Sequence, residues 1–306
     1  MDWAIPGPAN PNASWKDVVD FTRPIMLVLP GLSGGSHDQY VRKLVNDMLQ
    51  LNWQCVVQNA RGCARTPIKS PEFFCMAKTE DVRKAIQTIE LYFNLKNSSQ
   101  KFVACGFSMG SNLLVKYLGE EEEKTPLHGA ISIGNPYDLV RCTRHFRETW
   151  WYRYTYDRAL TSNLKRLVFH KNEGGKILAR NPRINLKALR NVQTLNDFDE
   201  QLTVIVYNYA NVGAYHEAGS SVRVMDRVKI PLLCVSAKDD PICISEGIPY
   251  EMVKRNPNVI LVTTNTGGHL GFFESTRDTL RNPRKPRTCW STKVAREFAE
   301  SVRNRC

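Results

Sequence analysis

The sequence lacks the long apolar runs that a membrane-spanning helix requires. Such a span needs about 18 or more apolar residues in a row, whereas the longest apolar strings, such as residues 25–29, are only as long as a strand. Residues 1–8 have neither a basic n-region nor an apolar h-region, so they do not indicate a signal peptide or an anchor. These absences predict a protein that is cytoplasmic or peripheral to a membrane.

Closely paired cysteines are also absent. The nine cysteines are dispersed and form no Cys-x-x-Cys pair, which argues against a zinc site and against a disulfide framework. Cys55, Cys105 and Cys234 lie inside apolar runs, where a free thiol packs as a small hydrophobic side chain. The glycines and prolines show no repeat and 42% of the residues are hydrophobic, which excludes a collagen-like or disordered chain.

Short apolar runs alternate with helical patterns along most of the chain. Thr79 is placed to cap one of these helices, with Glu80 and Asp81 in its first turn. The alternation predicts a single α/β domain over residues 1–306 with a mainly parallel sheet. The expected strands span 25–29, 54–58, 102–105, 130–133, 231–235 and 259–262, and the expected helices span 38–48, 79–93, 111–118 and 291–302.

The alternation fails between about 138 and 228, so this segment is predicted to be an insertion between core parts at about 20–137 and 229–306. Residues 141–190 contain thirteen Lys and Arg against three Asp and Glu, in a chain with a formal charge of +12, and aromatic residues cluster at 150–156. A nucleic-acid-reading module is not recognisable, which argues against a nucleic-acid partner. A second basic cluster, at 281–287, is predicted to be a surface loop.

The pentapeptide Gly106-Phe107-Ser108-Met109-Gly110 carries the strongest functional signal. A G-x-S-x-G between a strand and a helix is typical of a nucleophile elbow, in which a serine occupies a strained turn and small neighbours avoid collisions with the adjoining strand and helix. The alternative is a chance Gly-Ser turn. The strand before it and the helix after it favour Ser108 as a catalytic nucleophile.

A nucleophilic serine needs a general base and an acid that orients the base, expected here in the order Ser, Asp or Glu, His. His269 follows the expected strand 259–262 and is preceded by two glycines, a position that the other five histidines lack. Asp239 and Asp240 both follow the strand 231–235. We favour Asp240 as the acid because the turn Pro241-Ile242 comes directly after it, with Asp239 as the alternative.

The oxyanion of the reaction needs backbone donors, which this arrangement takes from the residue after the serine and from a loop after an early strand. The candidates are the N–H groups of Met109 and Leu32. Gly31, Gly34 and Gly35 would let the backbone approach a substrate closely. A phosphate-binding loop is the alternative for these glycines, but neither G-x-G-x-x-G nor a Gly-Lys-Ser/Thr ending is present.

In combination these motifs resemble the AB-hydrolase superfamily, in the branch of α/β-hydrolase-domain lipases and esterases that includes the plant embryogenesis-associated protein and bacterial YheT-type esterases. The resemblance implies the α/β-hydrolase fold, with residues 138–228 as a helical lid. It also implies a serine esterase or acylglycerol lipase that cleaves carboxylic esters of lipids through an acyl-enzyme, without a metal or organic cofactor. The matching segments are 29–36, 59–62, 106–112, 237–241 and 267–272.

Several alternatives stay open at this point. The basic lid fits either contact with anionic lipid headgroups or a solvated helical cap. A non-catalytic or truncated hydrolase-fold protein that binds anionic lipid surfaces is the alternative function. Animal members of the branch usually begin with a spanning helix that this chain lacks, and a start at Asp2-Trp3 leaves open whether the edge strand is present. Acyl chain length, headgroup and oligomeric state are not determined by the sequence.

Overall fold

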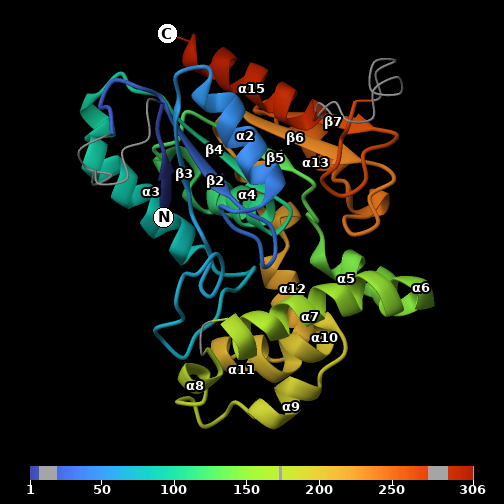
Figure 1. The fold of residues 1–306 in the computed structure, drawn as a ribbon. Coiled ribbons are helices and arrows are strands. Elements are labelled where there is room, and N and C mark those ends of the chain that lie inside the picture. Colours follow the sequence, from blue (N-terminus) through green and yellow to red (C-terminus); the bar gives the residue numbers. More distant parts are fainter. Residues whose placement is uncertain (7–18, 172–173, 275–288, 306) are drawn as a thin grey trace, which may run out of the picture.

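The computed structural model describes residues 1–6, 19–171, 174–274 and 289–305. Its centre is a seven-stranded sheet in the order β1-β3-β2-β4-β5-β6-β7 (Figure 1). All neighbouring strands are parallel except β1, which runs antiparallel to β3. The predicted mainly parallel α/β sheet is therefore confirmed. The strands are β1 (Asp2–Ala4), β2 (Ile25–Leu29), β3 (Gln54–Val57), β4 (Phe102–Phe107), β5 (Gly129–Ile133), β6 (Leu232–Ala237) and β7 (Val259–Thr264).

The edge strand that the sequence left open is present as β1. Trp3 pairs with Val56 across the antiparallel ladder, and its ring lies 5.6 Å from that of Phe93 on a neighbouring helix. Three residues are too few to show a period of two, which is why the sequence pattern did not predict this strand.

Helices cover both faces of the sheet, as a parallel sheet requires. One face packs against α2 (Gln39–Leu49) and α15 (Trp290–Arg303), and the other against α3 (Glu80–Phe93), α4 (Met109–Glu121) and α13 (Tyr250–Arg255). Every residue of β2 is buried. Burial on both faces explains why this strand reads as an uninterrupted apolar run.

The start of α3 differs from the prediction. Thr79 precedes the helix, but its side chain makes no capping hydrogen bond. Its backbone is already in the helical region, and its hydroxyl donates instead to the Glu120 carboxylate on α4. Thr79 thus stands at the predicted N-cap position, but the capping hydrogen bond is absent because an acceptor on α4 takes the hydroxyl.

In its described part the segment between β5 and β6 consists of helices joined by loops, without a strand, and forms a cap at one end of the sheet (Figure 1). Shorter 3₁₀ and π turns join or extend its helices, including π turns at 153–157, 167–171 and 199–203 and a 3₁₀ helix at 221–227. Its α-helices are α5 (Leu139–Glu148), α6 (Trp150–Tyr152), α7 (Arg158–Arg166), α8 (Gly174–Leu178), α9 (Leu186–Asn191), α10 (Leu195–Phe198), α11 (Val204–Tyr207) and α12 (Val212–Gly219).

The cap has its own apolar core, which the loop between β3 and α3 completes. Cys63, Ile68 and Phe73 from that loop are buried against the cap residues Leu164, Leu167, Val168, Leu178, Leu189, Phe198 and Leu202. The last part of the segment packs on the sheet domain instead: a Cβ on Gly119 of α4 would lie 2.2 Å from the Val224 carbonyl oxygen. The cap is thus held by the loop between β3 and α3 and by helix α4.

Two expectations from the sequence concern the cysteines and the length of apolar helices within the described ranges. The eight cysteines there, all except Cys306, are buried and carry reduced thiols rather than disulfides. No helix in these ranges is both long and apolar enough to cross a bilayer. The basic cluster at 281–287 lies outside the described residues.

Candidate active site

Ser108 occupies a strained turn between β4 and α4. Its φ of 52° and ψ of −117° place it in a region that non-glycine residues rarely adopt. A Cβ on Gly106 would lie 2.5 Å from Ser111 Cα, and one on Gly110 would lie 2.2 Å from the Leu29 carbonyl oxygen. Both glycines of the motif are therefore required by close backbone packing, as in a nucleophile elbow.

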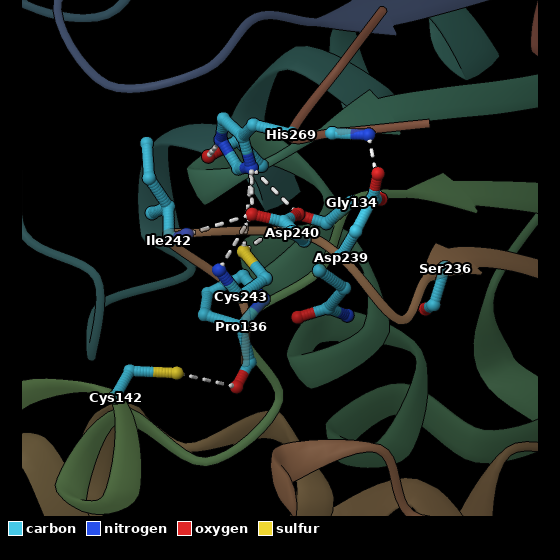
Figure 2. A network of polar contacts seen from close by, with 12 residues as sticks. Gly134, Pro136, Cys142, Ser236, Asp239, Asp240, Ile242, Cys243 and His269 are labelled. Carbon is cyan, nitrogen blue, oxygen red and sulfur yellow. Dashed lines mark hydrogen bonds and ion pairs between the residues drawn. The ribbon is translucent and has the colours of Figure 1, made fainter. Parts of the chain in front are cut away.

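Ser108, His269 and Asp240 form a continuous series of polar contacts. His269 Nε2 lies 2.8 Å from Ser108 Oγ. On the other side of the ring, His269 Nδ1 lies 2.9 Å from Asp240 Oδ2 and 3.2 Å from Oδ1 (Figure 2). The Asp240 side chain is 1% exposed and that of His269 is 20% exposed. The structure thus brings together three residues that lie up to 161 positions apart in the sequence.

The two neighbouring carboxylates contact different groups. Asp240 Oδ1 accepts hydrogen bonds from the N–H groups of Ile242 and Cys243, at 2.8 and 2.9 Å, which fixes the carboxylate beside the imidazole. Asp239 Oδ1 accepts a hydrogen bond from the Gly268 N–H at 2.8 Å. Asp240 therefore orients the ring of His269, while Asp239 holds the backbone of its loop.

Cys243 is part of this site, although its position in the sequence did not indicate a role. Its Sγ donates to the Gly134 carbonyl oxygen at 3.0 Å and lies 3.6 Å from His269 Nδ1 (Figure 2). Burial, together with the nearby Asp240 charge, raises the pKa of this thiol well above its ordinary value. Its position three residues after Asp240, inside the turn that the carboxylate closes, is the signal that could have identified it.

Asp240, Cys243 and His269 also have potential metal-ligand atoms within 4.8 Å of one another. A metal ion bound there would have to displace the thiol proton and take Nδ1 from the Asp240 carboxylate. In the described structure these atoms are already engaged, the thiol with the Gly134 carbonyl oxygen at 3.0 Å and Nδ1 with Asp240 at 2.9 Å, which favours the hydrogen-bonded arrangement.

The candidate oxyanion donors, Met109 and Leu32, come from two different elements beside Ser108. Met109 is the first residue of α4, so its N–H has no acceptor within the helix. Leu32 lies in the loop after β2, and both residues border the same small cavity as Ser108. Both donors were predicted from their positions in the sequence, and both lie next to Ser108 in the structure.

Tyr40 supports the loop that carries Leu32 and was not identified from the sequence. Its hydroxyl oxygen accepts a hydrogen bond from the Gly31 N–H at 3.0 Å, and its ring packs edge-on against Phe107 at 4.9 Å. Burial raises the pKa of Tyr40 far above its usual value, so the phenol stays neutral. Tyr40 lies in α2, nine positions after Gly31, and no sequence motif connects the two residues.

Two cavities of different character meet at Ser108 and His269. The larger, of about 550 Å³, has a mixed lining, in which the polar groups include Ser33, Asp38, Tyr40 and Asn163. The smaller, of about 90 Å³, has a mainly apolar lining. Leu32 and Leu160 border both cavities. The apolar lining comes chiefly from Met76, Pro136, Leu139, Cys142, Phe146, Leu195 and Ile242.

Residues 24–276 match the family model described as the alpha/beta hydrolase fold. The chain therefore belongs to the alpha/beta hydrolase fold family. It is 34% identical over 278 residues to the embryogenesis-associated protein EMB8 of Picea glauca, covering 89% of this chain and 58% of that protein. It is 32% identical over 259 residues to a monoacylglycerol lipase of Saccharomyces cerevisiae, covering 83% of this chain and 56% of that one.

A third relative, phospholipase ABHD3 of Mus musculus, is 31% identical over 285 residues, which is 92% of this chain and 64% of that protein. The chain thus spans less than two thirds of the length of these relatives. The solved esterase Pf2001 of Pyrococcus furiosus has a TM-score of 0.52 at 15% identity, covering 92% of this chain and 85% of that one. At that identity the likeness concerns the fold, and the predicted α/β-hydrolase fold is confirmed.

Proposed function

We propose that this chain is a serine-type carboxylic ester hydrolase that acts on lipid esters, such as the acyl chains of acylglycerols or phospholipids. The observation that carries this proposal is the series of contacts Ser108–His269–Asp240, placed where a larger cavity of mixed lining and a smaller apolar cavity meet. The names of the relatives, among them a monoacylglycerol lipase and a phospholipase, support the same class of substrate.

In the proposed first step, Ser108 Oγ attacks the ester carbonyl carbon while its proton passes to His269 Nε2, which lies 2.8 Å away. The N–H groups of Leu32 and Met109 stabilise the resulting oxyanion. His269 then gives the proton to the leaving alcohol oxygen as the carbon–oxygen bond breaks, which leaves an acyl group on Ser108. Asp240 stabilises the transient imidazolium and keeps Nδ1 directed away from the serine.

Water completes the cycle in the proposed second step. It attacks the acyl carbon, gives its proton to His269 Nε2, and the acid is released as Ser108 Oγ takes the proton back. The apolar cavity suits the acyl chain, because burying each methylene is worth about 0.8 kcal/mol. The larger cavity, whose lining includes Ser33, Asp38 and Asn163, then receives the alcohol part of the ester.

A lipid substrate places the protein at a lipid surface, and we propose that the basic cap makes the peripheral contact. Thirteen Lys and Arg in residues 141–190 support attraction to anionic headgroups. The alternative is a non-catalytic lipid-binding protein. It is disfavoured because lipid binding requires neither the strained backbone of Ser108 nor its 2.8 Å contact with His269.

The proposal is tested by steady-state hydrolysis of p-nitrophenyl esters whose acyl chains lengthen from acetyl. We expect KM to fall about fourfold per added methylene until the apolar cavity is filled. Ser108→Ala should lower kcat by about 10³-fold or more, while Ser162→Ala, an exposed serine of the cap, should retain the wild-type rate. Equal activity of Ser108→Ala and wild type would refute the proposed function.

A further inference from the structure

Exposed aromatic side chains gather on one part of the cap. Trp150, Trp151 and Tyr154 are 69%, 56% and 59% exposed, and Tyr156 follows two residues later at 37%. Single exposed apolar side chains are common on soluble proteins, but a contiguous group of large ones marks an interaction surface. We name residues 144–158, which contain this group, the aromatic arm.

The aromatic arm is an ordered structure. It consists mainly of the end of α5, of α6 and of the π turn 153–157. Figure 1 shows α5 and α6 extending beyond the other cap helices. The rings of Trp150 and Trp151 pack edge-to-face at 5.8 Å, and those of Tyr152 and Tyr156 stack at 5.6 Å. Because these contacts hold the side chains, little conformational entropy would be lost when the surface binds a partner.

The charge of the aromatic arm is strongly positive on its surface. It contains four arginines and two acids, and one of the acids, Asp157, is buried. Within the described part of the chain, none of the ion pairs involves Arg144, Arg147 or Arg153, which are all exposed, although Arg153 also interacts electrostatically with the buried Asp157. These guanidinium groups are therefore available to an anionic partner, beside aromatic rings of the kind that prefer the membrane–water interface.

The aromatic arm also lines the route to Ser108. Phe146 and Arg147 border the apolar cavity that contains Ser108 and His269. Arg147 and Asp157 border in addition a polar cavity of about 660 Å³, which Arg144 and Arg153 line as well. Tyr154 and Tyr156 thus lie in the same π turn as Arg153 and Asp157 of the cavity walls. Trp150 and Trp151 lie on α6, between this turn and α5.

We propose that the aromatic arm is a docking surface for an anionic lipid bilayer. Trp150, Trp151 and Tyr154 would enter the interfacial layer while the arginines contact lipid phosphates. This orientation presents the cavities beside Arg147 to the bilayer, so that an acyl chain passes from the membrane toward Ser108. The passage of substrate rests on the proposed function, whereas the binding of the bilayer does not.

Binding is tested with the Ser108→Ala protein, so that hydrolysis cannot alter the vesicles. Co-sedimentation is measured with vesicles of phosphatidylcholine alone and of phosphatidylcholine with phosphatidylserine. We expect preferential binding to the mixed vesicles, at least a tenfold loss on adding Trp150→Ala and Trp151→Ala, and loss of the preference on adding Arg144→Gln and Arg153→Gln. The matched control is Leu91→Ala, which removes a 79% exposed side chain from α3 and should leave binding unchanged.

Three results would overturn the proposal: no binding to either vesicle, undiminished binding by the tryptophan variant, or a dimer that the tryptophan substitutions dissociate without any vesicle binding. The last result would assign the surface to a second copy of the chain. Circular dichroism checks that the variants are folded. With Ser108 intact, the tryptophan variant should hydrolyse soluble p-nitrophenyl butyrate normally. If the wild-type protein hydrolyses no ester, the proposed function is refuted. The co-sedimentation result still shows whether the aromatic arm binds the bilayer.

Discussion

Asp239 and Gly268 are joined by a hydrogen bond of 2.8 Å from the glycine N–H to Asp239 Oδ1, one residue before the candidate base His269. The φ of Gly268 is +58°, and its Cα faces open space. The neighbouring Asp240 contacts the imidazole itself. Two adjacent carboxylates thus hold the loop and the ring of the same histidine, and their substitutions should have different effects.

Asparagine substitutions at the two positions separate these effects. Asp240→Asn removes the charge that stabilises the imidazolium and permits the wrong tautomer, so kcat should fall by about 10²- to 10⁴-fold. Asp239→Asn keeps an oxygen that can accept the Gly268 N–H, and we expect less than about a tenfold loss. Steady-state kinetics on a soluble ester measures both. A larger loss for Asp239→Asn than for Asp240→Asn would contradict the assignment.

Tyr40 should affect turnover through the loop that carries Leu32. Tyr40→Phe keeps the ring against Phe107 but removes the acceptor of the Gly31 N–H, which costs about 1–3 kcal/mol when a buried donor is left unpaired. We expect kcat to fall about tenfold with little change in KM. The exposed Tyr250 provides the control variant Tyr250→Phe. An unchanged kcat for Tyr40→Phe would show that the loop needs no such support.

The glycine at position 110 should be irreplaceable for packing reasons. A methyl group on its Cα would lie 2.2 Å from the Leu29 carbonyl oxygen, at the carboxyl end of β2. Gly110→Ala should therefore lower the free energy of unfolding by about 3 kcal/mol or more. Gly175→Ala in α8 meets no atom closer than 3.4 Å and should be neutral or slightly stabilising. Urea unfolding compares the two, and equal stabilities would refute the packing argument.

Asp157 should make stability depend on pH. Burial raises its pKa above the ordinary value of 3.8, although the Leu195 N–H donates to it at 2.6 Å. A raised pKa means that the folded state binds the proton more tightly than the unfolded state does. The contribution to stability is therefore present at acid pH and is lost as the pH rises from 3.8 through the folded-state pKa.

The variant Asp157→Asn isolates this effect, because its amide oxygen can still accept the Leu195 N–H but does not titrate. The wild type should lose stability relative to the variant as the pH rises from about 4 toward neutrality. Thermal unfolding of both proteins across this range measures the difference. Parallel curves would mean that the carboxyl group titrates normally in the folded state.

Much of the sheet could be predicted because parallel strands are buried on both faces. The run at residues 25–29 coincides with β2, and the order of Ser108, Asp240 and His269 followed from the elements around them. The cap helices were less predictable, since several are only three to six residues long and are interrupted by π turns, which break the helical period.

The remaining features depend on contacts between distant parts of the chain. Tyr40 reaches Gly31 across nine positions, and Cys243 meets Gly134 across 109. The difference between Asp239 and Asp240 is also set by what each carboxylate touches, namely the Gly268 N–H and the His269 ring. None of these contacts leaves a periodic trace in the sequence.

The most direct test of the central claim is covalent labelling of the folded protein with a fluorophosphonate, followed by mass spectrometry of the intact chain and of its peptides. The activated serine should carry a single adduct on the peptide that contains Ser108. Ser108→Ala should not be labelled, whereas Ser162→Ala should be labelled like the wild type. An adduct at another residue, or labelling that persists in folded Ser108→Ala, would contradict the assignment of Ser108 as the nucleophile.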